Sequence, residues 1–385
     1  MKLCRAGIRA FSLPLVAPLS TAHGPIAQRR GRLIRLEDEA GRHGLGEATP
    51  LPEFGTEGLE VCERALMGGI AALLELGHAS PAQAREVARR DCSQAPCARA
   101  ALECAIEDLA AQQASSNLAS FWRRRAGLAG EPAKQVAVQA LVGGESPDAV
   151  AESARQALGR GHHTFKLKLA VSSRARAIEP DLERVAALRE AVGSEARLRL
   201  DANEAWTRGG AQSALRALAD FDIDYVEQPV ARGDLEGLRV LDREGPIPVA
   251  ADEALLGDGL ARCLAQRAVS ILIVKPAALG GVSVAIRLMS EAQTLGLRIV
   301  WSSLLDGAIS RSAGCHLAAA LGPEAEVHGL ATGSLLGRDF VASAAEAGAL
   351  LRCPQAPGLG LGDAVGFSDD APLWVGRPRF VEAPQ

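Results

Sequence analysis

The stretch that decides the fold runs from residue 196 to residue 252, where ARLRLD (196–201), IDYVE (223–227) and IPVAAD (247–252) each end in a carboxylate. Each segment has the length and composition of a buried strand, and the residues between them space their apolar side chains as a helix does. Parallel strands need such a crossover helix. The stretch therefore predicts three consecutive βα units.

The same rhythm continues on both sides of this stretch. Eight apolar segments begin 24 to 32 residues apart, which is the length of one strand, one helix and two short loops. Eight βα units close a barrel. The strands are expected at 136–142, 164–169, 196–201, 223–227, 247–252, 271–275, 298–303 and 326–331, and the helices at 147–159, 180–192, 208–219, 234–243, 258–266, 281–295 and 308–320.

The residues before the barrel follow a different pattern. Strand-like segments at 2–13 and 29–38 come first, and helical spacing follows at 57–76, 81–91 and 95–113. This order predicts a separate α+β domain. The expected fold is α/β, with an N-terminal α+β capping domain at 1–130, a (β/α)7-8 TIM-type barrel at 131–340 that carries the functional residues, and a C-terminal segment at 341–385 that packs back on the capping domain.

The composition narrows the classes of partner. The 385 residues are 48% hydrophobic and 23% charged, and the net charge of −4 comes without the basic stripe that nucleic acid requires. No apolar run approaches the ~18 residues of a membrane helix, and Pro14 and Pro18 interrupt the run near the N-terminus. The eight cysteines form no CxxC pair, which predicts reduced thiols in a cytoplasmic protein, with disulfides as the alternative. The sequence leaves a homo-oligomer open.

Two lysines share one face of the strand expected at 164–169. Side chains alternate along a strand, so Lys166 and Lys168 point one way and the apolar residues between them point the other. If the apolar set faces the helices, both lysines point into the barrel, where burial and like charge lower the pKa of at least one. A solvated edge strand is the alternative. Lys275 ends another strand on the opposite wall.

Three carboxylates, Asp201, Glu227 and Asp252, end consecutive strands and lie 26 and 25 residues apart. Because βα loops build the pocket of a barrel, these side chains are expected to converge there. Converging carboxylates repel one another unless a cation holds them, and oxygen ligands select a hard ion such as Mg²⁺, with Mn²⁺ as the alternative. The competing interpretation is that each carboxylate caps the following helix.

This arrangement predicts proton abstraction next to a carboxylate. A metal ion at the three acidic side chains would bind a small carboxylate substrate and stabilise the enediolate formed when the α-proton leaves. Lys168 and Lys275 would then face the α-carbon from opposite sides. A barrel that binds metal without catalysis is the less favoured alternative, because lysines lie on both walls.

These elements resemble the enolase superfamily, in particular its muconate-lactonizing-enzyme subgroup. The subgroup's KxK, DxN, EQP, DE and KP elements match residues 166–168, 201–203, 227–229, 252–253 and 275–276 in order. The superfamily combines a lysine base with Mg²⁺. The resemblance implies three catalytic lysines (Lys166, Lys168 and Lys275), three metal ligands (Asp201, Glu227 and Asp252), and two supporting residues (Asn203 and Glu253).

Further residues complete the expected site. Gly280 and Gly281 would let backbone amides approach an anionic group at the start of the next helix, or else form a simple tight turn. The stretch at 44–52 resembles the substrate-specificity loop of the family's capping domain. The resemblance implies substrate contacts from Glu47, Pro50 and Leu51 in the capping domain and from Ser302 and Ser303 at the end of a barrel strand.

The stretch at 46–52, the segment at 18–19 and the two serines at 302–303 most resemble the o-succinylbenzoate synthases of menaquinone biosynthesis. Such enzymes dehydrate 2-succinyl-6-hydroxy-2,4-cyclohexadiene-1-carboxylate to o-succinylbenzoate. The resemblance implies that Lys168 removes the α-proton and returns it to the leaving hydroxyl on the same face. It also implies that Lys275 stabilises the enediolate and that Lys166 lowers the pKa of Lys168. Asp306 departs from the pattern, since many synthases have Glu there.

The runner-up is a racemase or epimerase that acts on N-acylated amino acids or dipeptides with the same metal site and both lysines; another muconate-lactonizing-type enzyme is also open. Dipeptide epimerases carry a DxD at strand eight that binds the substrate ammonium, whereas this chain has GLATG at 329–333. An ammonium without a carboxylate partner is costly to desolvate. For this alternative, the sequence therefore favours N-acylamino acids over dipeptides.

Overall fold

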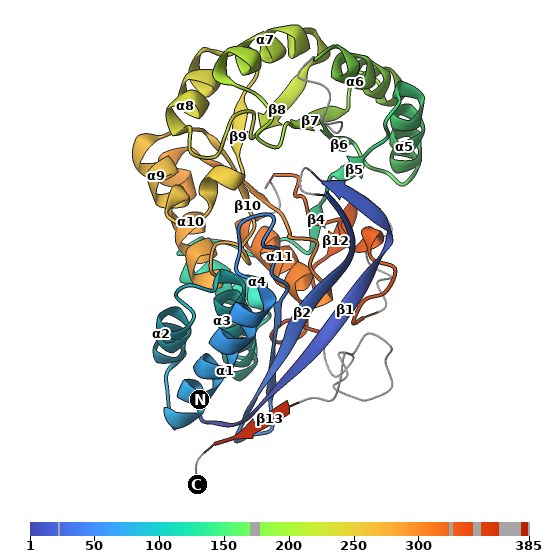
Figure 1. Cartoon of the computed structure of the whole chain (residues 1–385). Helices are drawn as coiled ribbons and strands as arrows, with labels where there is room; N and C mark the ends of the chain where they lie inside the picture. Colours follow the sequence, from blue (N-terminus) through green and yellow to red (C-terminus); the bar gives the residue numbers. More distant parts are fainter. Residues whose placement is uncertain (22–23, 170–177, 323–325, 342–347, 362–378, 384–385) are drawn as a thin grey trace.

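The structure is a computed structural model that describes residues 1–21, 24–169, 178–322, 326–341, 348–361 and 379–383. Its two parts are a curled parallel sheet covered by helices and an antiparallel sheet packed on helices (Figure 1). The expected α/β class with a barrel-type sheet and an N-terminal α+β part is confirmed. In the described residues, no helix is long and apolar enough to cross a membrane. None of the eight cysteines, all of which are described, forms a disulfide.

An antiparallel sheet with the strand order β13-β1-β2-β3 forms the N-terminal part. Strand β13, from the C-terminal end of the described chain, pairs with β1 and places Val381 opposite Ala6. Helices α1, α2 and α3 pack their apolar faces on this sheet. The elements are β1 (Leu3–Thr21), β2 (Gly24–Asp38), β3 (His43–Ala48), α1 (Leu59–Glu75), α2 (Pro81–Asp91), α3 (Pro96–Gln113), α4 (Leu118–Arg125) and β13 (Arg379–Glu382).

The hairpin of β1 and β2 is longer than the sequence predicts. Strand pairing continues to Thr21 opposite Gly24, although its register shifts between Pro14 and Leu19. Proline removes a donor from a strand ladder, which is why this stretch did not have a strand pattern. The extended hairpin reaches across to the barrel (Figure 1), where Leu19 and Ile26 line a pocket.

Seven parallel strands, β5 to β11, lie side by side in chain order, and helices α5 to α11 cover the outside of the sheet (Figure 1). On β6, Phe165 and Leu167 are fully buried, whereas Lys166 and Lys168 face the pocket. The strands are β5 (Ala140–Val142), β6 (Thr164–Lys168), β7 (Arg197–Asp201), β8 (Ile223–Glu227), β9 (Val249–Ala251), β10 (Ile271–Val274) and β11 (Arg298–Trp301). The helices are α5 (Pro147–Gly159), α6 (Glu179–Val192), α7 (Arg208–Leu218), α8 (Leu235–Glu244), α9 (Gly259–Gln266), α10 (Val282–Leu295) and α11 (Ala308–Leu321).

The eighth expected strand contributes two isolated bridges instead of a ladder. His328 pairs with Val138 and Gly329 pairs with Ser302, so the segment lies between the first and the seventh strand of the barrel. Burial lowers the pKa of His328 to about 3 and keeps its ring neutral. The ring Nδ1 then accepts the Trp301 N–H at 3.1 Å. The Trp301 N–H therefore bonds to the His328 side chain, where a neighbouring strand would offer a backbone carbonyl.

The first expected barrel strand, at 136–142, is divided in two. Its first half, β4 (Gln135–Ala137), pairs with β12 (Leu350–Arg352), and only β5 joins the barrel sheet. Between the two halves, Gln139 donates its backbone N–H to the His328 carbonyl at 2.9 Å. This division leaves the Gln139 side chain at the pocket.

Two carboxylates of the N-terminal part cap helices of the barrel. Glu103 on α3 accepts the Ser283 N–H in the first turn of α10 at 2.8 Å. Glu47 on β3 accepts the N–H groups of Gly307 and Ser310 at the start of α11, at 2.5 and 3.1 Å. The first turn of a helix has unpaired N–H donors and a positive dipole end, which favour a carboxylate. The capping domain therefore fixes the ends of two barrel helices.

Gly46 lets helix α3 lie directly on strand β3. A Cβ at Gly46 would collide with the Ala101 carbonyl oxygen, which belongs to the backbone and has no room to move aside. By contrast, Gly68 is exposed on α1, and a Cβ there would meet no atom within 4 Å. Gly46 is therefore closely packed and Gly68 is not, so Gly68 is a control position for substitutions at Gly46.

We expect Gly46→Ala to lower the free energy of unfolding by about 3 kcal/mol, because the added methyl forces α3 away from the sheet. Gly68→Ala should raise it by about 1 kcal/mol, since alanine is the better helix former. Urea unfolding followed by circular dichroism measures both. Equal effects at the two positions would contradict the close approach of α3 and β3.

Candidate active site

A pocket at the carboxyl ends of the barrel strands collects most of the predicted site residues. The barrel strands form its floor and walls, and the β1–β2 hairpin and the loop after β3 complete it from the capping domain. The predicted residues that line it are Leu51, Lys166, Lys168, Asp201, Asn203, Asp252, Glu253, Lys275, Ser302 and Ser303.

Lys166 lies among buried carboxylates. Its Nζ is 2.8 Å from Asp201 Oδ2 and 2.7 Å from Glu227 Oε2, two residues that are direct neighbours in the strand register. Burial alone would lower the pKa of Lys166, but the charges of Asp201, Glu227 and Asp252 outweigh it and raise that pKa well above its ordinary value. Lys166 is therefore an ammonium ion, and the expected lowering of a lysine pKa does not occur at this residue.

The carboxylates around Lys166 still lack positive charge. Burial and the charge of Asp201 raise the pKa of Glu227 to about 8, and burial also raises the pKa of Asp252, although Lys275 pairs with it. At Asp201 burial alone would raise the pKa, but the charges of Lys166, Lys168 and Lys275 together outweigh it and lower the pKa. A divalent cation would supply the charge that this cluster lacks.

Glu253 adds an unsatisfied oxygen to the same cluster. Its Oε2 is buried without a hydrogen-bond partner in the described residues, while Oε1 accepts from Asn203 Nδ2 at 3.3 Å. A carboxylate-rich oxygen donor set suits Mg²⁺. As the side chains stand, no three His, Cys, Asp or Glu of the described chain are arranged to hold a metal ion. Lys166 and Lys275 instead pair with the acids, whose chemistry nevertheless fits Mg²⁺.

The acidic side chains do not cap the helices that follow them. Helix α7 is capped by Thr207, and α8 is capped by Asp234. Asp252 precedes the 3₁₀ turn at Glu253–Leu255 and makes no cap hydrogen bond from its side chain. The helix-capping interpretation is therefore wrong for these strand ends.

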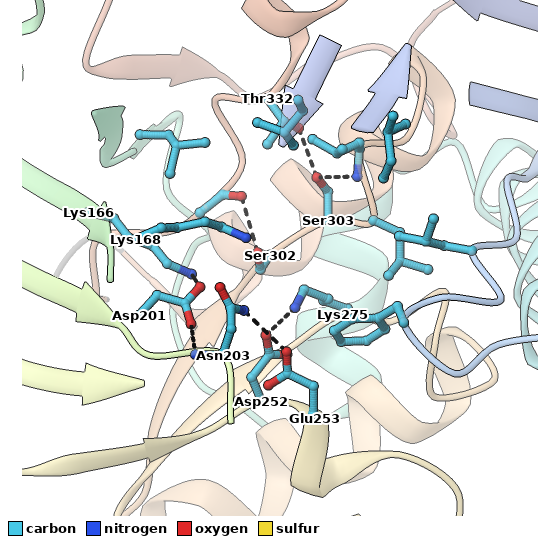
Figure 2. A pocket seen from close by; sticks show the side chains of 18 of the residues that line it. Lys166, Lys168, Asp201, Asn203, Asp252, Glu253, Lys275, Ser302, Ser303 and Thr332 are labelled. Carbon is cyan, nitrogen blue, oxygen red and sulfur yellow. Dashed lines mark hydrogen bonds and ion pairs between the residues drawn. The ribbon is translucent and has the colours of Figure 1, made fainter. Parts of the chain in front are cut away.

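Lys168 and Lys275 approach the pocket from opposite sides. Figure 2 shows Lys166 and Lys168 on one flank, Lys275 on the other, and Asp201 and Asp252 between them. They come from β6 and from the residue after β10, which are separated by three strands of the sheet. The space between them is therefore bounded by an amine on each side.

The loop after β3 covers Lys275. The ring of Phe54 lies 4.0 Å from Lys275 Nζ, which is the geometry of a cation–π contact. Arg232 Nη1 donates to the Phe54 carbonyl at 3.1 Å, and the same guanidinium pairs with Glu204. This pair ties the loop to the barrel and keeps the aromatic ring over the lysine.

Five predicted site residues do not line the pocket, and one of them, Glu227, is fully buried and pairs with Lys166. Glu47 caps α11 on strand β3, so the stretch at 44–48 is a strand and not the expected loop. Pro50 does not line the pocket, and its carbonyl accepts from Arg29 Nη2 at 3.2 Å. Gly280 and Gly281 pack against α3, and Glu103 already occupies the start of α10. The positive φ of both glycines and the hydrogen bond from Gly281 N–H to the Pro276 carbonyl at 2.8 Å favour the alternative of a simple tight turn here.

Several lining residues were not predicted. They come from the hairpin extension, from the split first strand and from loops whose neighbours only the fold defines. Glu204 directly follows the predicted Asn203, and Ala331 and Thr332 lie at the end of the expected eighth strand, but nothing local marks the others. These residues are Ile26, Gln139, Leu141, Glu204, Arg232, Leu304, Leu305, Ala331 and Thr332.

Residues 149–362 match the enolase C-terminal domain-like family, and residues 4–106 match the MenC N-terminal domain. The chain belongs to the enolase superfamily. The expected resemblance to this superfamily and its muconate-lactonizing subgroup is thereby confirmed. The chain's relatives include enzymes named as epimerases, racemases and cycloisomerases, and one of their solved structures matches 94% of this chain.

Two relatives and one solved structure illustrate the similarity. A hydrophobic dipeptide epimerase of Enterococcus faecalis is 31% identical over 83% of this chain and 88% of its own. An L-Lys-D/L-Arg epimerase of Methylococcus capsulatus is 30% identical over 94% of this chain and 99% of its own. A crystal structure of the dipeptide epimerase from Enterococcus faecalis V583 with Mg and L-Leu-L-Tyr has a TM-score of 0.84 and 30% identity, and it covers 94% of this chain and 99% of that one.

Glu47 gives this enolase-superfamily member a pH-dependent stability. Burial and the charge of Asp306 raise the pKa of Glu47 to about 7, above the value of an unfolded glutamate. A group whose pKa is raised on folding contributes stability at low pH that is lost as the pH rises through the folded value. We expect the free energy of unfolding of the wild type to fall by about 3 kcal/mol between pH 5 and pH 8 because of this group. Glu47→Gln, which cannot ionise, should not show this fall.

Urea unfolding of both proteins across this pH range measures the difference. Glu60→Gln, at an exposed position of α1, is the matched control and should follow the wild type. If Glu47→Gln loses as much stability as the wild type over this range, the buried carboxylate is not the cause.

Proposed function

We propose that the protein is a racemase or epimerase that inverts the α-carbon of an N-acylated amino acid, a class that includes dipeptides. The observation that carries this proposal is the pair of lysines, Lys168 and Lys275, on opposite sides of one pocket beside a cluster of carboxylates. Inversion requires removal of a proton from one face of a carbon and its return on the other. Two amines on opposite flanks supply that geometry.

The proton transfers balance over one turnover. Lys168, as a free amine, removes the α-proton from one face and becomes an ammonium ion. Lys275, already an ammonium ion, donates its proton to the other face and becomes an amine. The opposite enantiomer uses the same groups in reverse. The ring of Phe54 lies 4.0 Å from Lys275 Nζ and covers the amine on the side of the capping domain.

Asp201, Glu227 and Asp252 would hold Mg²⁺, and Glu253 and Asn203 would support them. When bound, Mg²⁺ supplies the positive charge that makes the substrate's carboxylate a better electron acceptor. Lys166 remains as a fixed ammonium between Asp201 and Glu227, where its charge favours the ionised form of both carboxyl groups and its contacts hold them in place. Mn²⁺ is the alternative ion for the same oxygen ligands.

Support for an epimerase comes from the relatives, whose names describe epimerisation of dipeptides, and from the Mg and L-Leu-L-Tyr named for the related crystal structure. The chain differs at strand eight, where it has neutral residues from Gly329 to Gly333. We therefore favour substrates whose acyl end is uncharged over those with a free ammonium beside strand eight.

A second candidate is the o-succinylbenzoate synthase reaction. The observation that favours it is the match of residues 4–106 to the MenC N-terminal domain. In that reaction Lys168 would remove the α-proton and return it to the leaving hydroxyl on the same face, and Lys275 would remain a cation. The diene absorbance of 2-succinyl-6-hydroxy-2,4-cyclohexadiene-1-carboxylate, followed with Mg²⁺ and with an EDTA control, tests this candidate directly.

For the main proposal, we expect the wild type in D2O with Mg²⁺ to exchange the α-proton of N-acylamino acids or dipeptides and to interconvert the two configurations. Lys168→Ala and Lys275→Ala should each lower racemisation by at least about 10³-fold, because each removes one of the two proton carriers. Each variant should still exchange the α-proton of the one enantiomer that faces its remaining lysine, with retention of configuration.

Proton NMR and chiral chromatography measure exchange and inversion separately. Lys134→Ala, an exposed lysine outside the pocket, is the control and should behave as the wild type. Equal loss of exchange for both enantiomers in Lys275→Ala would contradict a two-base reaction.

We also expect Mg²⁺ at 100 times its Kd to stabilise the folded protein by about 3 kcal/mol, because the ion binds the native carboxylate cluster. Asp201→Asn should lose this stabilisation, while Asp258→Asn on the surface should retain it. Thermal unfolding with and without EDTA measures the shift. An equal Mg²⁺ effect in Asp201→Asn would exclude Asp201 as a ligand.

A further inference from the structure

Gln139 places a side-chain amide at the pocket wall opposite the carboxylates. It lies in the gap between β4 and β5, lines the pocket and is only 8% exposed. Its position follows from the split of the first barrel strand, so no local sequence pattern marks it. The orientation of the amide decides whether it offers a donor or an acceptor to a bound molecule.

A buried arginine fixes that orientation. Arg199 Nη1 donates to Gln139 Oε1 at 2.8 Å and to the Val327 carbonyl at 2.6 Å. The same guanidinium is held by Asp224 and Glu326 at 2.9 and 2.6 Å, and it is fully buried inside the barrel. A guanidinium has donors only, so Gln139 must present its oxygen to it. The Gln139 NH2 group is therefore the end left for the pocket.

The Gln139 NH2 group lies beside a serine hydroxyl. A Cβ on Gly329 would be 3.2 Å from Gln139 Nε2 and 3.0 Å from Ser302 Oγ, so the absence of a side chain at Gly329 leaves room between these polar groups. No described residue accepts a hydrogen bond from Gln139 Nε2. Ser302 Oγ makes only a long contact, 3.5 Å, with the Gly329 carbonyl. Both groups are available to a ligand.

This wall of the pocket is polar but uncharged. Figure 2 shows Ser302, Ser303 and Thr332 across the pocket from Asp252 and Glu253. The Ser303 and Thr332 hydroxyls bond to each other at 2.8 Å, which occupies one of their two O–H donors, whereas Gln139 Nε2 and Ser302 Oγ both remain available to a ligand. The Gln139 NH2 group only donates, so it suits a neutral acceptor, and none of these side chains carries a charge that could pair with an ammonium ion.

From this geometry we infer that Gln139 and Ser302 form a subsite for the carbonyl oxygen of the substrate's N-acyl group, an inference that rests on the proposed function. With the substrate carboxylate at the acidic cluster and the α-carbon between Lys168 and Lys275, the acyl group extends toward the opposite wall. The amide carbonyl of an N-acylamino acid is the neutral acceptor that meets Gln139 Nε2 there. Gln139 is thus a substrate-binding residue that selects acylated substrates.

The test compares two probes, N-acetyl-L-leucine and N-thioacetyl-L-leucine, whose sulfur is the weaker acceptor. The Mg²⁺-loaded wild type, Gln139→Glu and Gln139→Leu are assayed for α-proton exchange in D2O, as kcat/KM for each probe. Gln139→Glu still accepts from Arg199 and so preserves the fold, but it has no N–H to donate. Gln156→Glu, on the exposed face of α5, is the matched control.

We expect the wild type and the control to exchange the acetyl probe about fivefold faster than the thioacetyl probe. The two Gln139 variants should show no such preference, and their kcat/KM for the acetyl probe should be about tenfold lower than that of the wild type, mainly because KM rises. The same preference in wild type and variants would overturn the subsite but leave the proposed function intact. Failure of the wild type to exchange either probe or any other N-acylamino acid or dipeptide would overturn both. Circular dichroism and the Mg²⁺-induced thermal shift confirm that the variants are folded.

Discussion

The burial of several carboxylates at one end of a barrel is the constraint on which the rest of the site depends. Asp201 and Glu227 are neighbours in the strand register and are almost fully removed from water, with Asp252 on the next strand. Like charges in a poorly solvated site repel strongly, so cations must lie among them. Lys166 supplies one such charge, and the raised pKa of Glu227 indicates that another is needed. The same constraint supports our proposal that a metal ion at this cluster would bind the substrate carboxylate.

The rest of the pocket is built by docking the capping domain on the barrel. Its buried carboxylates, Glu47 and Glu103, replace the missing partners of the first N–H groups in α11 and α10. Each such contact combines a charged hydrogen bond with a helix dipole, so it holds the two parts in a defined relative position. That position brings Phe54 over Lys275 and the hairpin residues to the pocket. The position of the loop over Lys275 and the ends of these barrel helices therefore depend on the same interface.

Periodicity predicted the elements well where one face of each is apolar. The strands that end in Asp201 and Glu227 and the helices between them lie where the sequence places them, because their apolar side chains repeat at the spacing of a strand or a helix. The prediction failed where a proline interrupts the strand pattern or where a side chain replaces a backbone group as hydrogen-bond partner. The hairpin past Pro14 was missed, and the eighth barrel strand is reduced to two bridges beside the His328 ring.

The sequence by itself determined the parallel sheet, the order of its strands and the acidic and basic residues at the strand ends, because strand order and side-chain alternation follow from local spacing. Only the tertiary structure decided which of these groups meet. Glu47 lies within the loop that the sequence predicts at 44–52, but in the fold it caps a helix that begins some 260 residues later. Gln139 has no local signal, and its donor end faces the pocket only because Arg199, two strands away, occupies its oxygen. Such roles depend on contacts between distant parts of the chain, and hydrogen-bond direction is set by those contacts.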